Sequence, residues 1–189
     1  MGRVFPEIDA ALRDFLARQH VFFVATAPAG SAGHVNVSPK GLDTFRVTGP
    51  RSVAYLDFIG SGAETIAHVR ENRRITLLFC AFEGVPRILR LYGEGSIVEP
   101  ADADWAALRE SFPPGPARAI VRVDVTRVAD SCGFGVPLFR YEGERTQLPA
   151  WMERKGEELH DYQRRKNAAS IDGLPALRWV EDSMGEEES

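Results

Sequence analysis

The stretch from residue 119 to residue 128 constrains the fold of this chain more than any other part of the sequence. From Val121 onward it alternates apolar with charged or polar residues, in the letters VRVDVTRV. Because successive side chains of a strand point to opposite faces, the pattern predicts a long β-strand with one buried face. Shorter runs rich in β-branched and aromatic residues predict further strands at residues 20–26, 34–38, 44–47, 52–56, 75–82 and 87–99.

Helical spacing of apolar residues predicts helices at residues 7–19, 62–72, 102–112 and 151–169. The second of these follows the letters SGAE, which match a capping box with Ser61 as the N-cap and Glu64 reaching back. Gly93 and Gly95 are expected to mark a bend or bulge in a long strand. Six or seven strands with intervening helices indicate a mainly β, α+β fold, an antiparallel barrel with peripheral helices rather than repeated βαβ units.

Length and composition limit the classes of protein to which the chain can belong. Its 189 residues fit one domain, expected to span residues 1–180, followed by an acidic, flexible tail at 181–189. No apolar run approaches the roughly 20 residues that cross a bilayer, and the first residues lack a secretion signal, so we expect a cytoplasmic protein with no membrane partner. The formal charge of −4 does not favour nucleic acid as a partner. Neither the two cysteines nor the four histidines have the spacing of a metal site.

The segment from Tyr55 to Glu64 is the first candidate binding feature. It joins the end of a strand to Gly60-Ser61-Gly62 and then to a helix, so free backbone N–H groups and a positive helix end meet at one turn. This turn either binds an anion such as a phosphate or is a simple strand-turn-helix connection. Lys40, at the end of another predicted strand, either supplies a cation to the same anion or is a solvated turn lysine.

Arg87 and Arg90 flank apolar residues of the strand at 87–99 and are further cationic candidates. The planar guanidinium group suits phosphate recognition, although a salt bridge on the outer face of the sheet explains the same residues equally well. The chain contains neither a nucleotide-binding fingerprint nor a hydrolase signature, so no residue is assigned a catalytic role.

Five segments, taken in order, resemble the flavin-binding split-barrel family related to pyridoxamine 5′-phosphate oxidase. They are Val35–Lys40, Val53–Tyr55, Ser61–Asn72, Ile75–Phe79 and Arg87–Gly93. The resemblance covers about residues 8–130. It implies a six-stranded antiparallel split β-barrel, a homodimer, and FMN held at the subunit interface with its phosphate near basic residues.

The resemblance also implies which residues bind the cofactor. They are Val37, Ser38, Lys40, Tyr55, Leu56, Ser61, Gly62 and Thr65, with Arg90 as a further cation for the phosphate. The chain departs from the oxidase pattern at Ser61-Gly62, where adjacent basic residues are expected, and at Ile88, where a glutamine is expected. These departures leave a deazaflavin or haem as alternative ligands.

The function implied by the resemblance is that of an FMN-dependent oxidoreductase acting on an unknown small molecule. The alternative is a protein that binds haem or flavin without catalysis, for sequestration or sensing. Vitamin B6 oxidation is not implied, because the oxidase's C-terminal arginine and histidine pattern is absent. The loop from Cys132 to Leu138 either closes over a ligand or packs against the partner subunit.

Overall fold

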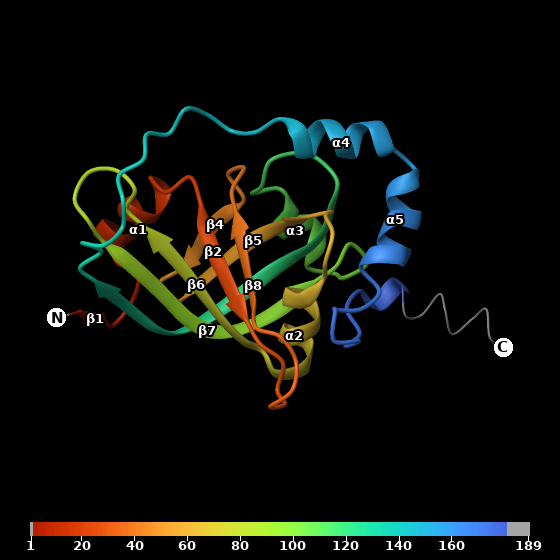
Figure 1. The fold of residues 1–189 in the computed structure, drawn as a ribbon, viewed down its shortest axis with the longest axis horizontal. Coiled ribbons are helices and arrows are strands. Elements are labelled where there is room, and N and C mark those ends of the chain that lie inside the picture. The colour runs from red at the N-terminus through yellow and green to blue at the C-terminus, as the bar shows by residue number, and fades with distance from the viewer. Residues whose placement is uncertain (1, 181–189) are drawn as a thin grey trace.

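One antiparallel sheet forms the framework of the computed structural model, which describes residues 2–180. Its strands are β1 (Val4–Phe5), β2 (Phe22–Thr26), β3 (Asn36–Lys40), β4 (Phe45–Gly49), β5 (Ser52–Phe58), β6 (Arg74–Cys80), β7 (Ile88–Val98) and β8 (Ala117–Ser131). Their spatial order is β3-β2-β6-β7-β8-β5-β4, and β1 pairs with β8 (Figure 1). The ring of Phe22 on β2 contacts those of Phe45 on β4 and Tyr55 on β5, so the sheet curls until its two ends face each other.

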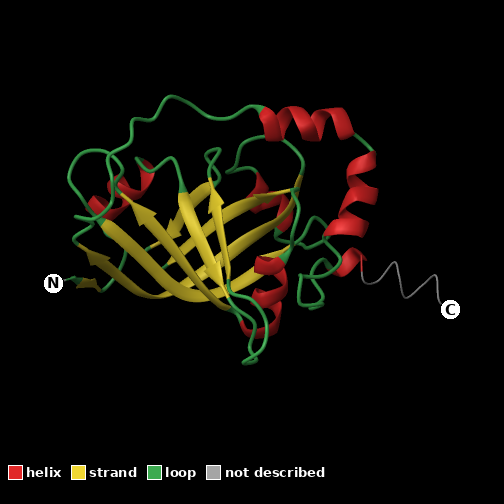
Figure 2. Ribbon diagram, in the orientation of Figure 1, coloured by secondary structure: helices red, strands yellow, loops and turns green. Residues whose placement is uncertain are grey.

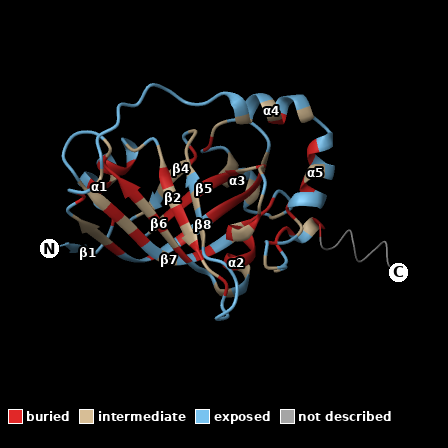
Figure 3. Ribbon diagram, in the orientation of Figure 1, coloured by how far each residue is buried: buried red, intermediate tan, exposed pale blue. Residues whose placement is uncertain are grey.

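The interior of this split barrel is filled by the inward side chains of alternating strand positions. On β8, Val121, Val123 and Val125 are buried in the same cluster as Leu89 and Leu91 of β7. Figure 3 shows the resulting bands of buried and exposed residues along the long strands. Each fully buried side chain of this size stabilises the fold by roughly 1.5–3 kcal/mol relative to an exposed one. The alternation predicted for residues 121–128 therefore marks the wall of the core.

The part of the chain from residue 2 to residue 180 has five named helices, and Figure 2 shows helices in red around the yellow sheet. They are α1 (Ala10–Ala17), α2 (Glu64–Asn72), α3 (Trp105–Arg109), α4 (Gln147–Lys155) and α5 (Glu158–Lys166). Asp9 caps α1 by accepting a hydrogen bond from the Leu12 N–H at 2.8 Å, and the helix buries Leu12, Phe15 and Leu16 in the barrel core. Between residues 2 and 180 no helix has the length and apolar character needed to cross a membrane.

The predicted architecture, an antiparallel split barrel with peripheral helices, is confirmed, but the sheet has eight strands rather than six. The two-residue β1 is too short to leave a periodic signal in the sequence. The predicted capping box is wrong, because α2 begins after Ala63 and no side chain caps it. Gly62 instead adopts the left-handed φ of 77°, and its carbonyl oxygen accepts a hydrogen bond from Arg118.

The helix predicted for residues 151–169 is also wrong, because the chain forms α4 and α5 with a break at Gly156. Gly156 has a φ of 47° and ends α4, a conformation that favours glycine. Met152 and Leu159, one from each helix, bury Ile59 at the end of β5. The acidic tail expected at 181–189 lies outside the described residues.

A crossing segment, residues 133–146, connects β8 to α4 over one end of the barrel (Figure 1). The Tyr141 ring stacks on the His20 ring with centroids 3.6 Å apart. The backbone N–H of Tyr141 donates to the Glu83 carboxylate at 2.9 Å. The Phe139 N–H donates to the Phe82 carbonyl at 2.9 Å. The segment is therefore held to the β6–β7 loop, to His20 between α1 and β2, and to the β3–β4 turn, where the Leu42 N–H donates to Glu144 at 3.3 Å.

Gly93 lies at a register shift between β7 and β8, as predicted for a bulge. A Cβ atom there would lie 2.3 Å from the Asp124 carbonyl oxygen and 2.8 Å from Val123 Cγ1. We expect Gly93→Ala to lower the free energy of unfolding by about 1–3 kcal/mol, as forced overpacking does, measured by urea denaturation. Gly135→Ala is the matched variant, because no heavy atom lies within 4 Å of the added Cβ. Equal stability of the two variants would contradict this account of the bulge.

Candidate functional site

A buried carboxylate, Asp57, is the centre of the candidate site. On β5 the inward positions alternate, so Val53 and Tyr55 lie in the barrel core and Asp57 follows them at the end of the strand. Asp57 is fully buried, and its two oxygens accept hydrogen bonds from different cations. Lys40 Nζ lies 2.6 Å from Oδ1 and Arg118 Nε lies 2.8 Å from Oδ2. Two cations around one carboxylate leave this group with one net positive charge.

Three strands bring this triad together. The pairing of β3 with β2 places Lys40 opposite Phe22 and on the inward face, so its side chain reaches across the opening of the barrel to β5. Arg118 enters from the start of β8, where it also donates to the carbonyl oxygens of Gly60 at 3.3 Å and Gly62 at 2.6 Å. The same guanidinium group therefore fixes both Asp57 and the turn before α2.

Burial and charge act in opposite directions on the titratable groups of this cluster. Burial alone would raise the pKa of Asp57, but the positive charges of Arg118 and Lys40 outweigh it and lower the pKa to about 2. Burial, followed by the negative charge of Asp57, raises the pKa of Tyr55 well above its usual value. At neutral pH Asp57 is therefore an anion and Tyr55 a neutral phenol. The buried Tyr55 hydroxyl faces the Thr65 hydroxyl but makes no hydrogen bond of good geometry within residues 2–180.

A second polar group continues along the inward face of β3 towards α2. Asn36 Nδ2 donates to Thr65 Oγ1 at 2.9 Å and to Thr26 Oγ1 at 3.2 Å, and Ser38 Oγ donates to Asn36 Oδ1 at 2.9 Å. The Thr26 hydroxyl is also 3.0 Å from Nδ1 of His68, which is fully buried on α2. Polar side chains therefore line the inward face of β3 from Asn36 to Lys40.

Four of the predicted cofactor residues gather in this region, namely Ser38, Lys40, Tyr55 and Thr65. Leu56 lies on the opposite face of β5 from Tyr55, where it is buried with Ile120 beneath α3. Val37 points outward from β3 and is 61% exposed. Alternation along a strand separates Val37 from Lys40 and Leu56 from Tyr55.

The remaining predicted residues lie in the turn before α2 and on β7. Ser61 is exposed and Gly62 contributes a carbonyl oxygen to Arg118. Arg90 lies on β7, where NH1 donates to Ser131 Oγ at 3.1 Å, and Arg87 pairs with Asp130 at 2.9 Å. Three strand positions separate β7 from β3 in the sheet, so neither arginine joins the cluster around Asp57.

Asp57 and Arg118 were missed by the sequence reasoning, although Asp57 carried a signal. It is the only charged residue in the run VAYLDF, at a position that strand alternation assigns to the core. A charge at a core position requires a partner, and Lys40 was already a candidate cation. Arg118 follows the Pro113–Pro116 cluster, where the start of the strand is not marked by alternation.

The residues present fit the phosphate of an FMN molecule in sign and donor chemistry. Lys40 is 20% exposed and uses one of its three N–H donors on Asp57, so two remain for an incoming anion. The orphaned Tyr55 hydroxyl lies in the same cluster, with Lys40 Nζ 6.0 Å from the centre of its ring. The turn before α2 adds no cation, and the Glu64 carboxylate lies close to Gly62. The site is therefore positive but weakly so.

The pKa of Asp57 gives the stability of the protein a defined pH dependence. Because the folded-state pKa lies below the ordinary value of 3.8, its contribution of about 2 kcal/mol is present above pH 3.8 and is lost as the pH falls towards 2. We expect Asp57→Asn to lower the free energy of unfolding by roughly 3–5 kcal/mol at pH 7, because two buried cations lose their counter-ion. Denaturant titrations at pH 7 and pH 3 measure both effects.

The matched variant is Asp104→Asn, which removes an exposed ion pair to Arg122. This substitution should lower the free energy of unfolding by less than about 1 kcal/mol. The stability difference between wild type and Asp57→Asn should shrink at pH 3, and a difference that is constant with pH would refute the assigned pKa.

Comparisons with known proteins agree with the fold and the site region. The family model described as pyridoxamine 5′-phosphate oxidase matches residues 8–132. The pyridoxamine 5′-phosphate oxidase family protein ustO of Aspergillus flavus is 41% identical over 202 residues, covering 96% of this chain and 80% of that protein. The alignment with ustO therefore includes α4 and α5, which follow the family match.

Solved structures share the fold at lower identity. A HupZ variant of Group A Streptococcus superposes with a TM-score of 0.53 at 21% identity, covering 66% of this chain and 99% of that one. A candidate pyridoxamine 5′-phosphate oxidase of Lactobacillus delbrueckii gives a TM-score of 0.51 at 15% identity, covering 67% and 98%. The family match, the fungal relative and the split barrel together show that this chain belongs to the pyridoxamine 5′-phosphate oxidase family.

Proposed function

We propose that this chain binds FMN and is a flavin-dependent oxidoreductase acting on a small molecule. The observation that carries the proposal is the arrangement of Lys40 and Arg118 around the single carboxylate of Asp57. The surplus positive charge lies where the family resemblance expects a cofactor phosphate. When bound, FMN would supply hydride or electron transfer, and the protein would supply binding and orientation.

The roles of this chain's own residues follow from their contacts. Lys40 would bind the phosphate, and Asp57 would hold the ammonium group in place at 2.6 Å. Arg118 would act as a positioning residue, since it joins Asp57 to the carbonyl oxygens of Gly60 and Gly62. Tyr55 stays protonated at neutral pH and can donate a hydrogen bond but cannot act as an anion.

The proposal includes a homodimer formed through the outer face of the sheet. We use the name outer face for the outward residues of β3, β2, β6 and β7, which are Phe23, Ala25, Val37, Pro39, Thr76, Leu78, Arg90 and Tyr92. They form two adjacent rows across four strands, and each is exposed or half-buried. Apart from Thr76 and Arg90 these residues are apolar or aromatic, and a largely apolar surface that extends over several strands is typical of an interaction site. A second copy of this chain is the partner that the family resemblance implies.

Lys40→Gln tests the cofactor assignment. A charge-assisted hydrogen bond to phosphate contributes roughly 1.5–3 kcal/mol, so this variant should bind FMN about 10- to 100-fold more weakly than wild type. Riboflavin, which lacks the phosphate, should bind both proteins equally. Quenching of flavin fluorescence measures all four dissociation constants, and the visible spectrum and the mass of any ligand released from purified protein identify the native cofactor.

Lys155→Gln is the matched variant for this experiment. Lys155 is also paired with a carboxylate, Glu158 at 2.6 Å, but lies on α4. It should bind FMN as wild type does. Unchanged FMN affinity in Lys40→Gln would remove Lys40 from the site, and a colourless protein that binds no added FMN would refute the cofactor proposal itself.

Val37→Asp tests the dimer. Val37 is 61% exposed on the edge strand, so a charge there should leave the fold intact and weaken association through the outer face. Light scattering after size exclusion should show a twofold fall in mass at micromolar concentration. Val85→Asp, at an 84% exposed valine of the β6–β7 loop, should leave the mass unchanged. A wild-type protein that is monomeric would disprove the proposed interface.

A second candidate function, haem binding without catalysis, is favoured by the geometry of His34. Its Nδ1 lies 2.7 Å from Asp172 Oδ1, its backbone N–H donates to Oδ2 of the same carboxylate at 2.8 Å, and its side chain is 75% exposed. A carboxylate on one ring nitrogen orients the imidazole and leaves the other free, as in many haem and metal ligands. A haem spectrum in the purified protein would select this function over flavin chemistry.

A further inference from the structure

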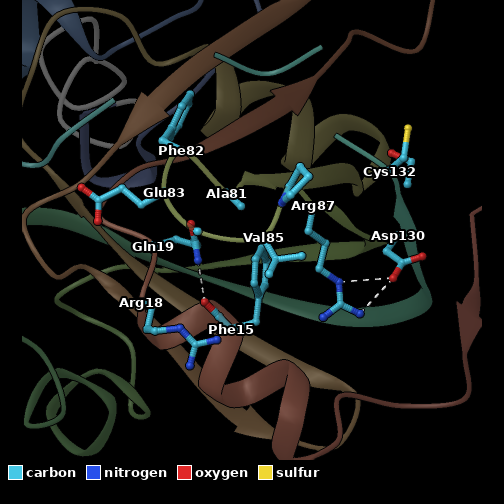
Figure 4. Close-up of a pocket in the computed structure, with 13 residues that line it drawn as sticks. Phe15, Arg18, Gln19, Ala81, Phe82, Glu83, Val85, Arg87, Asp130 and Cys132 are labelled. Carbon is cyan, nitrogen blue, oxygen red and sulfur yellow. Dashed lines mark hydrogen bonds and ion pairs between the residues drawn. The ribbon is translucent and has the colours of Figure 1, made fainter. Parts of the chain in front are cut away.

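A pocket of about 760 Å³ opens at the end of the barrel near α1 (Figure 4). Phe15, Arg18 and Gln19 form one wall, the β6–β7 loop from Ala81 to Arg87 forms the second, and residues 130–132 at the end of β8 form the third. The volume lies within the usual range of about 300–1,000 Å³ for small-molecule sites.

This pocket is separate from the cluster around Asp57. Its β8 wall, residues 130–132, lies at the opposite end of that strand from Arg118, which belongs to the cluster. None of the residues that line the pocket belongs to the cofactor residues assigned above. A ligand bound here would therefore occupy a second site.

One cation of the pocket has no counter-ion. Arg87 donates to Asp130 from Nε at 3.2 Å and from NH2 at 2.9 Å, and Asp130 also accepts from the Arg3 N–H. The Glu83 carboxylate accepts from the Tyr141 N–H. The Arg18 side chain makes no hydrogen bond or ion pair with any residue between 2 and 180. Arg87 and Asp130 therefore neutralise each other, and the four charges of the lining sum to zero. Arg18 is the cation of the lining whose guanidinium donors are all free among the described residues, while the Glu83 carboxylate is occupied by the backbone of the crossing segment.

The end of α1 does not cancel this charge. The last carbonyl groups of a helix carry partial negative charge and would repel an anion. Gln19 Nε2 donates to the Phe15 carbonyl at 2.8 Å, and the backbone N–H of Arg18 donates to the same oxygen (Figure 4). Two donors thus satisfy the Phe15 carbonyl oxygen, one of the last acceptors of the helix.

The rest of the pocket offers apolar surface close to the two arginines. Phe15 and Ala81 are buried at its base, Phe82 is half-buried, and Val85 is 84% exposed at its rim. The Arg87 guanidinium lies 5.3 Å from the centre of the Phe15 ring and is thereby fixed from two sides. A ligand that matches this surface has an apolar body and an acceptor group, such as a carboxylate, that can take the free N–H donors of Arg18.

We propose that this pocket binds a small organic acid, with its carboxylate on Arg18 and its apolar body against Phe15, Ala81 and Val85. Arginine suits a carboxylate because its planar fork offers two parallel donors. The proposal goes beyond the FMN function and does not depend on it.

The probe is 1-naphthaleneacetate, an aromatic carboxylate, compared with its neutral amide by calorimetric titration of the full-length protein. Wild type should bind the acid at least about 10-fold more tightly than the amide, the value of one charge-assisted hydrogen bond. Arg18→Gln should abolish that preference, and Val85→Glu, which places a negative charge at the rim, should weaken binding of the acid.

Arg154→Gln is the matched variant, because Arg154 is an exposed arginine on α4 and its loss changes the net charge equally. It should keep the preference for the acid. Arg18 is also exposed, so an unchanged thermal midpoint of Arg18→Gln excludes misfolding as the cause.

The free, exposed Cys132 in the wall of the pocket reports where the acid binds. Bound 1-naphthaleneacetate should slow the alkylation of Cys132 by N-ethylmaleimide, and saturating FMN should leave the affinity for the acid unchanged. Equal affinity of wild type for acid and amide, an Arg18→Gln variant that retains the preference, or an unprotected Cys132 would each overturn the proposal.

Discussion

The ion triad of Asp57, Lys40 and Arg118 is the constraint around which this structure is organised. Among the described residues β3 is an edge strand that pairs with β2 alone, so no backbone ladder there joins it to β5 across the opening of the barrel. The Lys40 side chain connects β3 to Asp57 on β5. The Arg118 side chain connects Asp57 to β8 and to the Gly62 carbonyl in the turn before α2. One buried carboxylate therefore links the end of β3, the barrel opening and the start of α2.

A buried ion triad is not the most stable way to close a barrel. Replacing buried ion pairs by well-packed apolar residues is often neutral or stabilising, because the charges no longer have to be desolvated. The triad also retains a surplus positive charge, and the adjacent Tyr55 hydroxyl makes no hydrogen bond of good geometry within the described chain. Both features cost stability in the free protein, and both would be compensated by a bound anion. This is the physical basis for treating the triad as a binding site rather than as a structural device.

The sequence predicted the framework well because alternation is a local property. The strands, the bulge at Gly93 and the choice of Lys40 as a candidate cation follow from neighbouring residues or from the family pattern. The partners of Lys40 do not, because Asp57 and Arg118 are far from it in sequence and only the curling of the sheet brings them together. The predicted capping box was wrong for a related reason. Arg118 donates a hydrogen bond to the Gly62 carbonyl and fixes a turn in which Ser61 is not the N-cap of α2. Leu56 and Tyr55 are adjacent on one strand, and alternation alone places them on opposite faces.

The C-terminal segment acts on the site from outside the barrel. Asn167 Nδ2 donates to the Gly60 carbonyl at 2.9 Å, and the Ile171 N–H donates to Glu64 at 3.3 Å. Asp172 binds His34 just before β3, and Leu177 packs against α2. Residues that follow the family match thus hold both sides of the region in which the phosphate is expected. The relative that aligns through these residues is the fungal protein at 41% identity, whereas the solved structures cover about two thirds of the chain. Features specific to this branch of the family are therefore to be sought where the C-terminal segment meets the turn from Gly60 to Glu64.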